Sequence, residues 1–338
     1  MTDRVSRLLH LGNVVVDVVL TVPVLPERGG DVLADTTTAT PGGGFNVMAA
    51  AARQGLAVAY AGVLGTGPFA DLAAAGLTAE GIEVLQPRRP GLDTGVVISL
   101  VDSDGERTFV TGPGAEARLT AGDLARVRGG PGDAVYVSGY GLLHASNRPA
   151  LLGWLAGLDP GRPVFFDPGP LAAQIPPSAL AAVAARADWL SCNAREAAIL
   201  TGHEDAASAA LAMGPGAGGG GGPGAGGGGR GGGGPGAGGD SGGRGVIVRM
   251  GADGCLLLAP GAGQLVHVPG FPVAAVDTNG AGDTHVGVFI AALACGADPT
   301  EAARQANAAA ALSVTRTGPA TAPSAAELAL FLAGSCPA

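Results

Sequence analysis

The chain has 338 residues, enough for one large hydrophobic core or for one domain with an appendage. Its formal net charge of −9 disfavours a broad binding surface for nucleic acid or for an anionic membrane, so neither partner is expected. All 19 of its Lys and Arg residues are arginines. This excludes mechanisms that need a lysine, such as a Schiff base or the phosphate-binding lysine of a Walker A loop.

The amino terminus resembles a secretory signal, because Arg4 and Arg7 precede an apolar run. Asp17 interrupts that run and no clean cleavage site follows, so we expect a buried first strand within residues 10–19 rather than a signal peptide. No stretch offers the ~20 uninterrupted apolar residues of a membrane span. The four cysteines are far apart and form no Cys-x-x-Cys pair, which favours a reduced, cytoplasmic protein.

Beyond this strand, β-branched runs alternate with alanine-rich segments. Residues 46–55 and 69–81 have helical composition and flank a strand-like run at 57–65. Further strands are predicted at 133–139, 163–169, 187–193, 245–251 and 254–260. Such alternation predicts βαβ units and an α/β fold whose largely parallel sheet is covered by helices on both faces.

Two stretches do not follow this alternation. Residues 18–40 and 92–115 alternate apolar and polar side chains, the second around a turn-like Asp102–Gly105. They predict antiparallel strands of a small additional sheet, a candidate cover for a site.

The segment 214–245 is almost pure glycine, with no apolar side chain larger than alanine or proline. It cannot offset the entropy of ordering it, so we predict a flexible surface loop.

The stretch 276–293, "VDTNGAGDTHVGVFIAAL", joins a glycine-rich turn to an apolar helix. The exposed amides of Gly280, Ala281, Gly282 and Asp283 at the helix amino terminus would form an anion hole for a transferred phosphoryl group. Asp283 would face the same point and take a proton from an incoming hydroxyl. Taken alone, the stretch is equally compatible with a simple N-cap and a tight turn.

The same residues carry a resemblance to a known family. The chain resembles the ribokinase-like (PfkB) carbohydrate kinases, whose pattern D-T-x-G-A-G-D is present at 277–283. Other matching motifs follow the family's order: Asp17 after the first strand, then 41–55, 104–109, 193–202, 248–254 and 306–324. The resemblance covers nearly the whole chain except the glycine tract, and implies a single domain with a doubly wound sheet and a small β-sheet lid.

The resemblance also implies ATP and Mg²⁺ as cofactors, Asp283 as the catalytic base, and Gly280, Ala281 and Gly282 as the anion hole. It implies that Asn193 and Glu196 organise magnesium and its waters.

Asn193 and Glu196 also fit a capping box at the start of a helix, which is compatible with that role.

Further binding residues are implied in the same way. Arg249, Gly251, Asp253 and Gly254 match the loop that approaches the nucleotide, and Asn307 lies in the segment that flanks the adenine.

In relatives activated by potassium, a carboxylate and carbonyls surround the ion. The equivalents here are Asp277, Asn279, Ser313, Arg316 and Gly318.

The sugar is expected at Asp17, Gly42, Gly43 and Asn46, because a carboxylate and an amide suit paired hydroxyls. Asp17 has the alternative of a buried polar residue satisfied by backbone. Tyr140 lies near where ribokinase carries a ribose-binding glutamate, and Gly43 stands where ribokinase has lysine. Ribose is therefore not the expected substrate.

A homodimer formed through the lid is a candidate assembly.

Two rival functions remain open. A nucleoside kinase would use the same base and anion hole, with aromatic side chains from the lid. An NAD-dependent oxidoreductase is a more distant alternative. It would use Gly65, Gly67 and Ala70 as a G-x-G-x-x-A fingerprint, with Glu83 further on.

Overall fold

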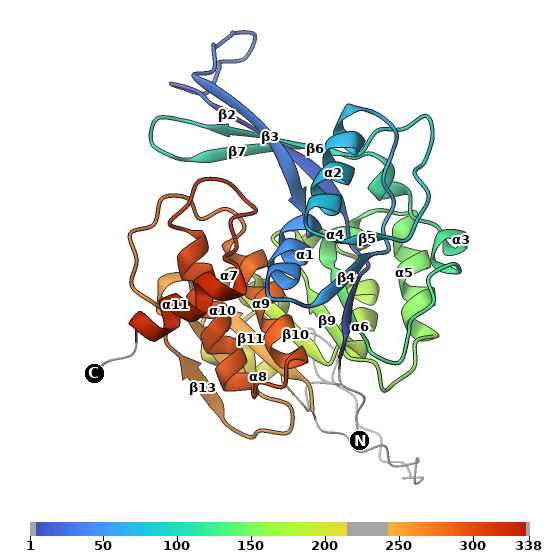
Figure 1. Ribbon diagram of the computed structural model, residues 1–338, viewed down its shortest axis with the longest axis vertical. Coiled ribbons are helices and arrows are strands. Elements are labelled where there is room, and N and C mark those ends of the chain that lie inside the picture. The colour runs from blue at the N-terminus through green and yellow to red at the C-terminus, as the bar shows by residue number, and fades with distance from the viewer. Residues whose placement is uncertain (1–4, 215–242, 336–338) are drawn as a thin grey trace, which may run out of the picture.

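The computed structural model describes residues 5–214 and 243–335, and a nine-stranded sheet forms the centre of this part (Figure 1). Its strand order is β13-β12-β11-β10-β9-β8-β1-β4-β5, and all neighbouring pairs are parallel except those made by β12. The strands are β1 (Arg7–His10), β4 (Ala57–Tyr60), β5 (Glu83–Val84), β8 (Asp133–Ser138), β9 (Val164–Asp167), β10 (Trp189–Asn193), β11 (Gly245–Arg249), β12 (Cys255–Leu258) and β13 (Leu265–Val268). The mostly parallel α/β fold predicted from the alternation is confirmed.

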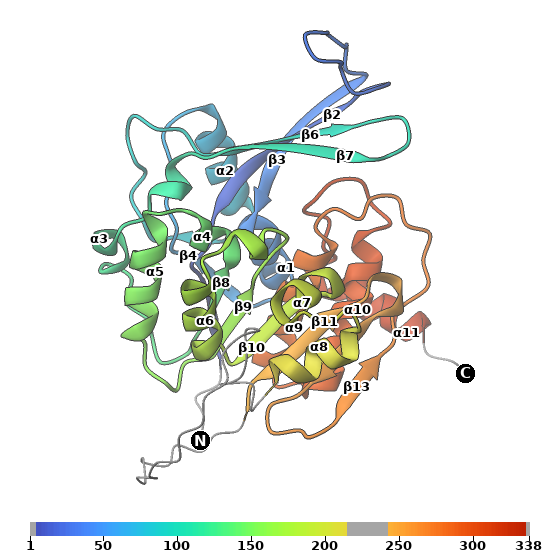
Figure 2. The same cartoon turned by 180° about the vertical axis from the view of Figure 1, so that it is seen from behind.

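Helices cover both faces of this sheet because successive side chains of each strand point to opposite sides. Leu8 belongs to one apolar core and Leu9 to the other. The first core packs against α1 (Gly44–Arg53), α2 (Pro68–Ala79), α9 (Ala281–Ala294) and α10 (Pro299–Ser313). The second, seen in front in Figure 2, packs against α5 (Asn147–Ala156), α6 (Pro177–Arg186), α7 (Ala194–Thr201) and α8 (Ala206–Met213). The remaining helices are α3 (Ala121–Leu124), α4 (Gly139–Leu143) and α11 (Ala325–Gly334).

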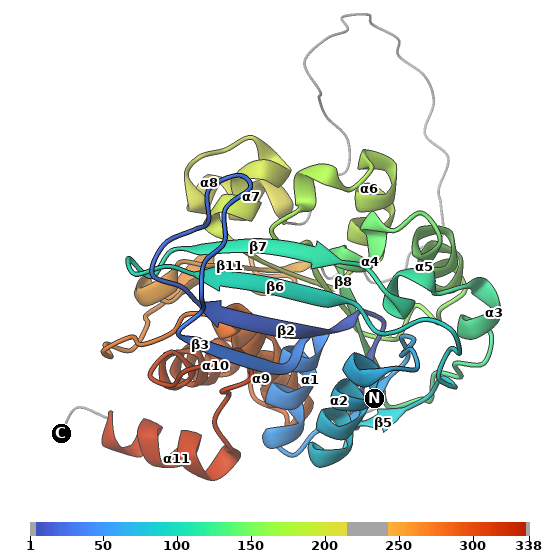
Figure 3. The same cartoon turned by 90° about the horizontal axis from the view of Figure 1, so that it is seen from above.

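A separate four-stranded sheet of order β3-β2-β6-β7 extends across the top of the molecule (Figure 3). Its strands are β2 (Val14–Thr21), β3 (Thr36–Gly43), β6 (Val96–Val101) and β7 (Arg107–Gly112). The pairs β2–β3 and β6–β7 are antiparallel, whereas β2 and β6 are parallel. We call this the small sheet.

The register of the small sheet decides which of its side chains share a face. Asp17 lies opposite Val97, and Val97 lies opposite Thr111. Arg107 and Phe109 precede Thr111 at two-residue steps along β7, so they lie on the same face as Asp17.

The single first strand predicted within residues 10–19 is wrong. The chain leaves the large sheet after His10, and Val14 already pairs with Gly43 in the small sheet. The break follows from local packing: the amide of Gly12 donates to His10 Nδ1 at 3.0 Å, and a side chain on Gly12 would collide with that ring. Asp17 therefore belongs to the small sheet itself.

The glycine-rich segment predicted as a flexible loop at 214–245 lies outside the described residues except at its ends. Among the described helices, none combines the length and apolar character needed to cross a bilayer.

Helices α1 and α9 pack closely because Gly287 presents no side chain between them. A Cβ at Gly287 would lie 2.4 Å from the carbonyl oxygen of Val47 and 2.7 Å from Cβ of Ala50. One turn earlier in each helix, Asn46 donates to Asp283 at 3.0 Å. The two helices therefore run in the same direction, and the close approach brings their amino-terminal turns together.

We expect Gly287→Ala to destabilise the protein by about 1–3 kcal/mol, because the added methyl group meets backbone that must shift. Urea unfolding measures this change. The matched control is Gly153→Ala in the exposed part of α5, where nothing lies within 4 Å of the added methyl. It should stabilise by up to about 1 kcal/mol through helix propensity. Equal stability changes in the two variants would contradict the packing described here.

Candidate active site

The candidate site lies where the parallel strands of the large sheet end. Strands β9, β10 and β11 end at Asp167, Asn193 and Arg249. Strands β1 and β8 are neighbours although their chain continuations lie on opposite sides of the sheet, and such a switch point forms a crevice at the carboxyl edge. The small sheet follows directly from β1, so its strands begin at this edge.

The amino terminus of α9 presents free amides to this edge. Gly280 adopts a left-handed conformation with φ of 75°, and a Cβ there would lie 2.0 Å from the carbonyl oxygen of Pro319. Only glycine fits this turn. Among the described residues, no acceptor is found for the amides of Gly280, Gly282 and Asp283, while the amide of Ala281 makes one long contact of 3.4 Å to Thr278. The geometry leaves these donors available to an anion.

Asp283 lies in the first turn of α9 and is partly buried. Burial, with smaller contributions from the negative charges of Asp167 and Asp17, raises the pKa of its carboxyl group to about 7. The hydrogen bond from Asn46 and the charge of Arg249 act in the opposite direction. A carboxylate with this pKa is suited to accept a proton near neutral pH.

Arg249 is the central cation of the site. Its guanidinium donates to Asp167 at 2.9 Å and to Ser191 at 2.6 Å, and lies 3.6 Å from Glu196. Burial opposes its charge, but the two carboxylates more than compensate and raise its pKa. A Cβ on Gly282 would lie 3.6 Å from this guanidinium, so Arg249 is next to the first turn of α9.

Asn193 and Glu196 form a capping box at the start of α7. The side chain of Asn193 accepts from the amide of Glu196 at 2.8 Å, and Glu196 accepts from the amide of Asn193 at 2.8 Å. Burial and the charge of Asp167 raise the pKa of Glu196, although Arg249 opposes this. The helix therefore fixes a carboxylate within the same cluster as Asp167.

The predicted sugar-binding residues meet between the small sheet and α1. A Cβ on Gly42 would lie 2.1 Å from Oδ2 of Asp17, so the carboxylate of Asp17 covers this glycine. Burial raises the pKa of Asp17 to about 6, and no hydrogen-bond donor to it is found among the described residues. Gly43 is the N-cap of α1, and Asn46 lies in the first turn of that helix.

Tyr140 lies near acidic groups of both the large-sheet edge and the small sheet. Burial raises the pKa of its hydroxyl to about 12, and the charges of Asp283, Glu196, Asp167 and Asp17 contribute in that order. All four carboxylates therefore lie within electrostatic range of this phenol.

The residues predicted for the nucleotide lie further along the same edge. Gly251 and Asp253 form a short turn after β11, and Gly254 makes a close backbone approach to Val268.

Asn307 is buried in α10. Its amide donates to the carbonyls of Val268 and Pro269, and its oxygen contacts Nε2 of His285 at 3.1 Å. A direct hydrogen bond from Asn307 to a nucleotide would have to replace one of these contacts.

The residues predicted for a monovalent ion also lie together, but with partners of their own. Asp277 accepts from the amides of Asn279 at 2.8 Å and Gly318 at 3.1 Å. The hydroxyl of Thr321 donates to the carbonyls of Ser313 at 3.0 Å and Gly318 at 3.4 Å.

The side chain of Arg316 is directed to Glu327, with which it forms an ion pair at 2.6 Å.

Three functional candidates were missed at the level of sequence. Asp167 ends a buried strand and precedes a proline, and this position at a carboxyl edge was a usable signal. Arg107 of β7 lies within the 104–109 motif, but it pairs with Asp277 at 2.7 Å across 170 residues of sequence, so the motif does not indicate its partner. Ser191 lies within the mostly apolar strand β10, and no motif distinguishes it from its neighbours.

The fingerprint Gly65, Gly67 and Ala70 is used for another purpose. The carboxylate of Asp93 accepts from the amides of Phe69 at 3.2 Å and Ala70 at 2.8 Å. A side chain of the protein therefore occupies the helix terminus at which a dinucleotide pyrophosphate would bind. This turn fastens α2 to the following segment and offers no free anion site.

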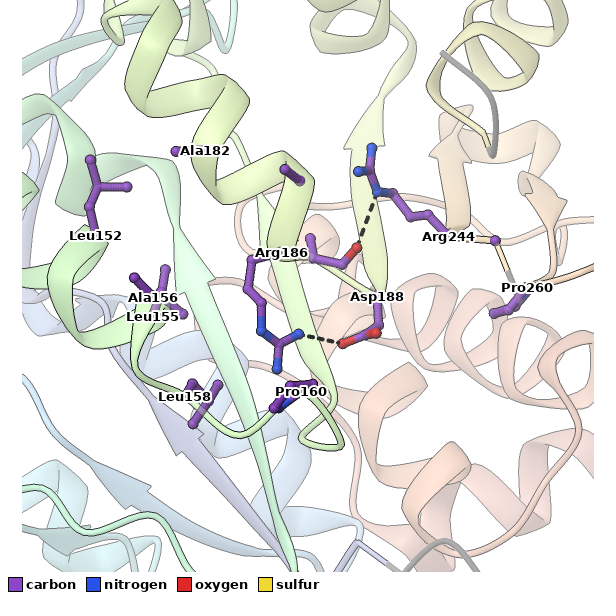
Figure 4. A pocket seen from close by; sticks show the side chains of 13 residues that line it. Leu152, Leu155, Ala156, Leu158, Pro160, Ala182, Arg186, Asp188, Arg244 and Pro260 are labelled. Carbon is purple, nitrogen blue, oxygen red and sulfur yellow. Dashed lines mark hydrogen bonds and ion pairs between the residues drawn. The ribbon is translucent and has the colours of Figure 1, made fainter. Parts of the chain in front are cut away.

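A cavity of about 610 Å³ lies at the opposite edge of the large sheet (Figure 4). Its lining is formed mainly by apolar side chains of α5 and α6. The charged groups in it have partners within the wall: Arg186 pairs with Asp188 at 3.1 Å, and Arg244 donates to the carbonyl of Ala187 at 3.1 Å. None of the candidate catalytic groups lies in this cavity.

Comparison with known proteins identifies the family. The model of pfkB family carbohydrate kinases matches residues 6–218 and 237–326. The chain is 31% identical over 331 residues to the uncharacterized sugar kinase YegV of Escherichia coli K12, covering 98% of this chain and 95% of that protein. It is 32% identical over 337 residues to an ATP-dependent ribose-1-phosphate kinase of Halopiger xanaduensis, covering 96% and 98%.

The fold agrees with this assignment. A ribokinase structure from Thermotoga maritima superimposes with a TM-score of 0.73 at 25% identity, covering 97% of this chain and 99% of that one. The predicted doubly wound fold with a small additional sheet is thus confirmed, and the oxidoreductase alternative is wrong. The chain belongs to the pfkB family of carbohydrate kinases and is a phosphotransferase that acts on a hydroxyl group.

Proposed function

We propose that the protein is an ATP-dependent sugar kinase that transfers the γ-phosphoryl group of ATP to a sugar hydroxyl. One observation carries this proposal: Asp283, with a pKa of about 7, stands in the same helical turn as the free amides of Gly280 and Gly282. A base and an anion site on one rigid turn suit phosphoryl transfer to an alcohol.

In this mechanism Asp283 accepts the proton of the attacking hydroxyl while Asn46 orients its carboxylate. The amides of Gly280, Ala281, Gly282 and Asp283 stabilise the negative charge that develops on the phosphoryl oxygens.

Asp17, Asn46 and the backbone at Gly42 and Gly43 hold the sugar, and Tyr140 closes the space beside them. Residues 1–338 act as one kinase domain, and the small sheet serves as its lid.

ATP is proposed as the donor because the relative from Halopiger xanaduensis is named as ATP-dependent. Asn193 and Glu196, with Asp167 beside them, offer the oxygen ligands that Mg²⁺ or its waters prefer. A bound magnesium ion would neutralise phosphate charge. Arg249 supplies the neighbouring positive charge from the protein itself.

Gly251, Asp253, Gly254 and Asn307 are proposed to line the nucleotide, mainly through backbone and packing.

A nucleoside remains the second candidate for the acceptor. Phe109 lies on the same face of the small sheet as Asp17, and 54% of its surface is exposed. An exposed ring at that position could stack on a nucleobase. A panel of sugars and nucleosides in an ADP-release assay distinguishes the two acceptors, and sedimentation of the protein tests the proposed dimer through the lid.

We expect Asp283→Asn to lower kcat by about 10²- to 10⁴-fold, because it removes the general base while retaining size and helix position. ADP release with the best acceptor of the panel measures the loss. The matched control is Asp71→Asn, another acidic residue in the first turn of a helix, but one outside the site. The control should retain parental turnover, and an active Asp283→Asn variant would remove the basis of the mechanism.

Asp283→Asn should lower activity but increase the stability of the fold. The folded-state pKa of Asp283 lies above its ordinary value of 3.8, so the folded protein binds this proton more tightly than the unfolded chain. Ionised Asp283 therefore reduces stability progressively as pH rises from about 4 through about 7. Asp283→Asn should raise Tm, with a larger gain at about pH 8 than at about pH 5. A constant or falling difference across this range would contradict the assigned pKa.

The pH dependence of kcat/KM should show an acidic limb near pH 7, since the base must be ionised. Asn46→Ala should move this limb to higher pH, because the lost hydrogen bond stabilises the ionised form of Asp283. Initial rates between about pH 5 and pH 9 test this. A limb that stays in place in the variant would assign it to another group.

Glu196→Gln should increase the Mg²⁺ concentration needed for half-maximal rate more than it changes the sugar KM. The carboxylate is assigned to the metal and its waters, so excess Mg²⁺ should partly restore turnover. Magnesium titrations of parent and variant provide the measurement. A changed sugar KM at unchanged magnesium dependence would place Glu196 on the acceptor side.

A further inference from the structure

An ion pair joins the small sheet to the loop at residues 277–280 that precedes α9. Arg107, the first residue of β7, donates through Nη2 to Oδ1 of Asp277 at 2.7 Å. Only 25% of the Arg107 side chain and 13% of the Asp277 side chain are exposed. The pair is thus more shielded from water than an ordinary surface salt bridge between two exposed side chains.

The carboxylate of Asp277 holds the loop before α9 through hydrogen bonds to two backbone amides. Its Oδ1 accepts from the amide of Asn279, and its Oδ2 accepts from the amide of Gly318. Three residues after Asp277, Gly280 begins the turn whose amides face the site. Any shift of the Asp277 carboxylate is thus transmitted through a short, hydrogen-bonded segment to the anion hole and to Asp283.

We propose that Arg107 is a positioning residue that couples closure of the small sheet to the geometry of the anion hole. This inference rests on the proposed function, because it gives a role to a residue that touches neither the acceptor nor the phosphoryl group. The guanidinium reaches Asp277 only while β7 lies over the large sheet. The loop is therefore held in its reactive arrangement when the small sheet covers the acceptor, and is released when the sheet lifts.

The ion pair also meets the charge requirement of this loop. The guanidinium of Arg107 places a positive charge beside the carboxylate of Asp277. The hydroxyl of Thr321 donates to the carbonyls of Ser313 and Gly318. Three of the five groups predicted to surround a potassium ion, those of Asp277, Ser313 and Gly318, are thus partnered by side chains of the chain itself. We therefore expect turnover that does not require potassium.

The first test is Arg107→Met, which preserves length and apolar packing but removes the charge. It should lower kcat roughly 10- to 100-fold, because misplacement of reacting groups by about 1 Å has effects of this size. The KM for ATP should change less than twofold and Tm should stay near the parental value. Arg107→Lys should restore part of the rate, since it keeps the charge but loses the planar fork.

Arg88→Met is the matched control. Arg88 forms an ion pair with Asp71 at the same distance of 2.7 Å, in a surface region outside the site. It should keep the parental kcat. An Arg107→Met variant with parental kcat, or one that loses kcat and Tm with no rescue by lysine, would overturn the proposal.

A double-mutant cycle with Asp277→Asn identifies the route of coupling. If Arg107 acts through Asp277, the double variant should lose no more rate than the worse single variant. Additive losses would show that Arg107 acts elsewhere, and parental turnover that requires potassium would show that Asp277 needs another cation. Either result overturns the inference. The proposed function fails separately, because only it requires Asp283→Asn to be inactive.

Discussion

The close parallel packing of α1 and α9 is the constraint on which the site depends. Gly287 allows the two backbones to approach, and the approach brings Asn46 within hydrogen-bond distance of Asp283. The groups proposed to bind the sugar and the phosphoryl group come from residues about 240 positions apart, so no local structure could align them. A tight helix pair transmits little motion, which suits the proposed role of Asp283 as a base that must stay in line with its acceptor.

The site concentrates negative charge and balances it with two arginines. Asp167 and Glu196 share Arg249, and Asp277 takes Arg107. Arg249 comes from the large sheet and is fixed by its strand, whereas Arg107 comes from the small sheet. Burial and neighbouring carboxylates raise the pKa of Asp283, while the arginine in the large sheet limits that rise. The raised pKa suits its proposed role as a base and carries a cost in stability, as expected where function and stability compete.

Sequence reasoning located local features well. The helix start at the 277–283 motif, the capping box of Asn193 with Glu196, and the antiparallel strands around Asp102–Gly105 all depend on near neighbours, and all are present. It failed where a choice between two sheets was needed. Residues 10–19 are rich in β-branched side chains, and Gly12 and Asn13 among them do not by themselves show that β1 and β2 belong to different sheets. The packing of Gly12 against His10 accounts for the break.

The sequence by itself determined the alternation of strands and helices, the family, and the glycine turn at Gly280, because spacing and residue type suffice for these. Tertiary structure alone decided that Asp93 fills the α2 terminus, that Arg249 lies beneath the first turn of α9, and that Arg107 reaches Asp277. The physical reason is that a charge finds its partner through space. Strand register and helix packing bring such partners together, and neither is encoded by the separation of the residues along the chain.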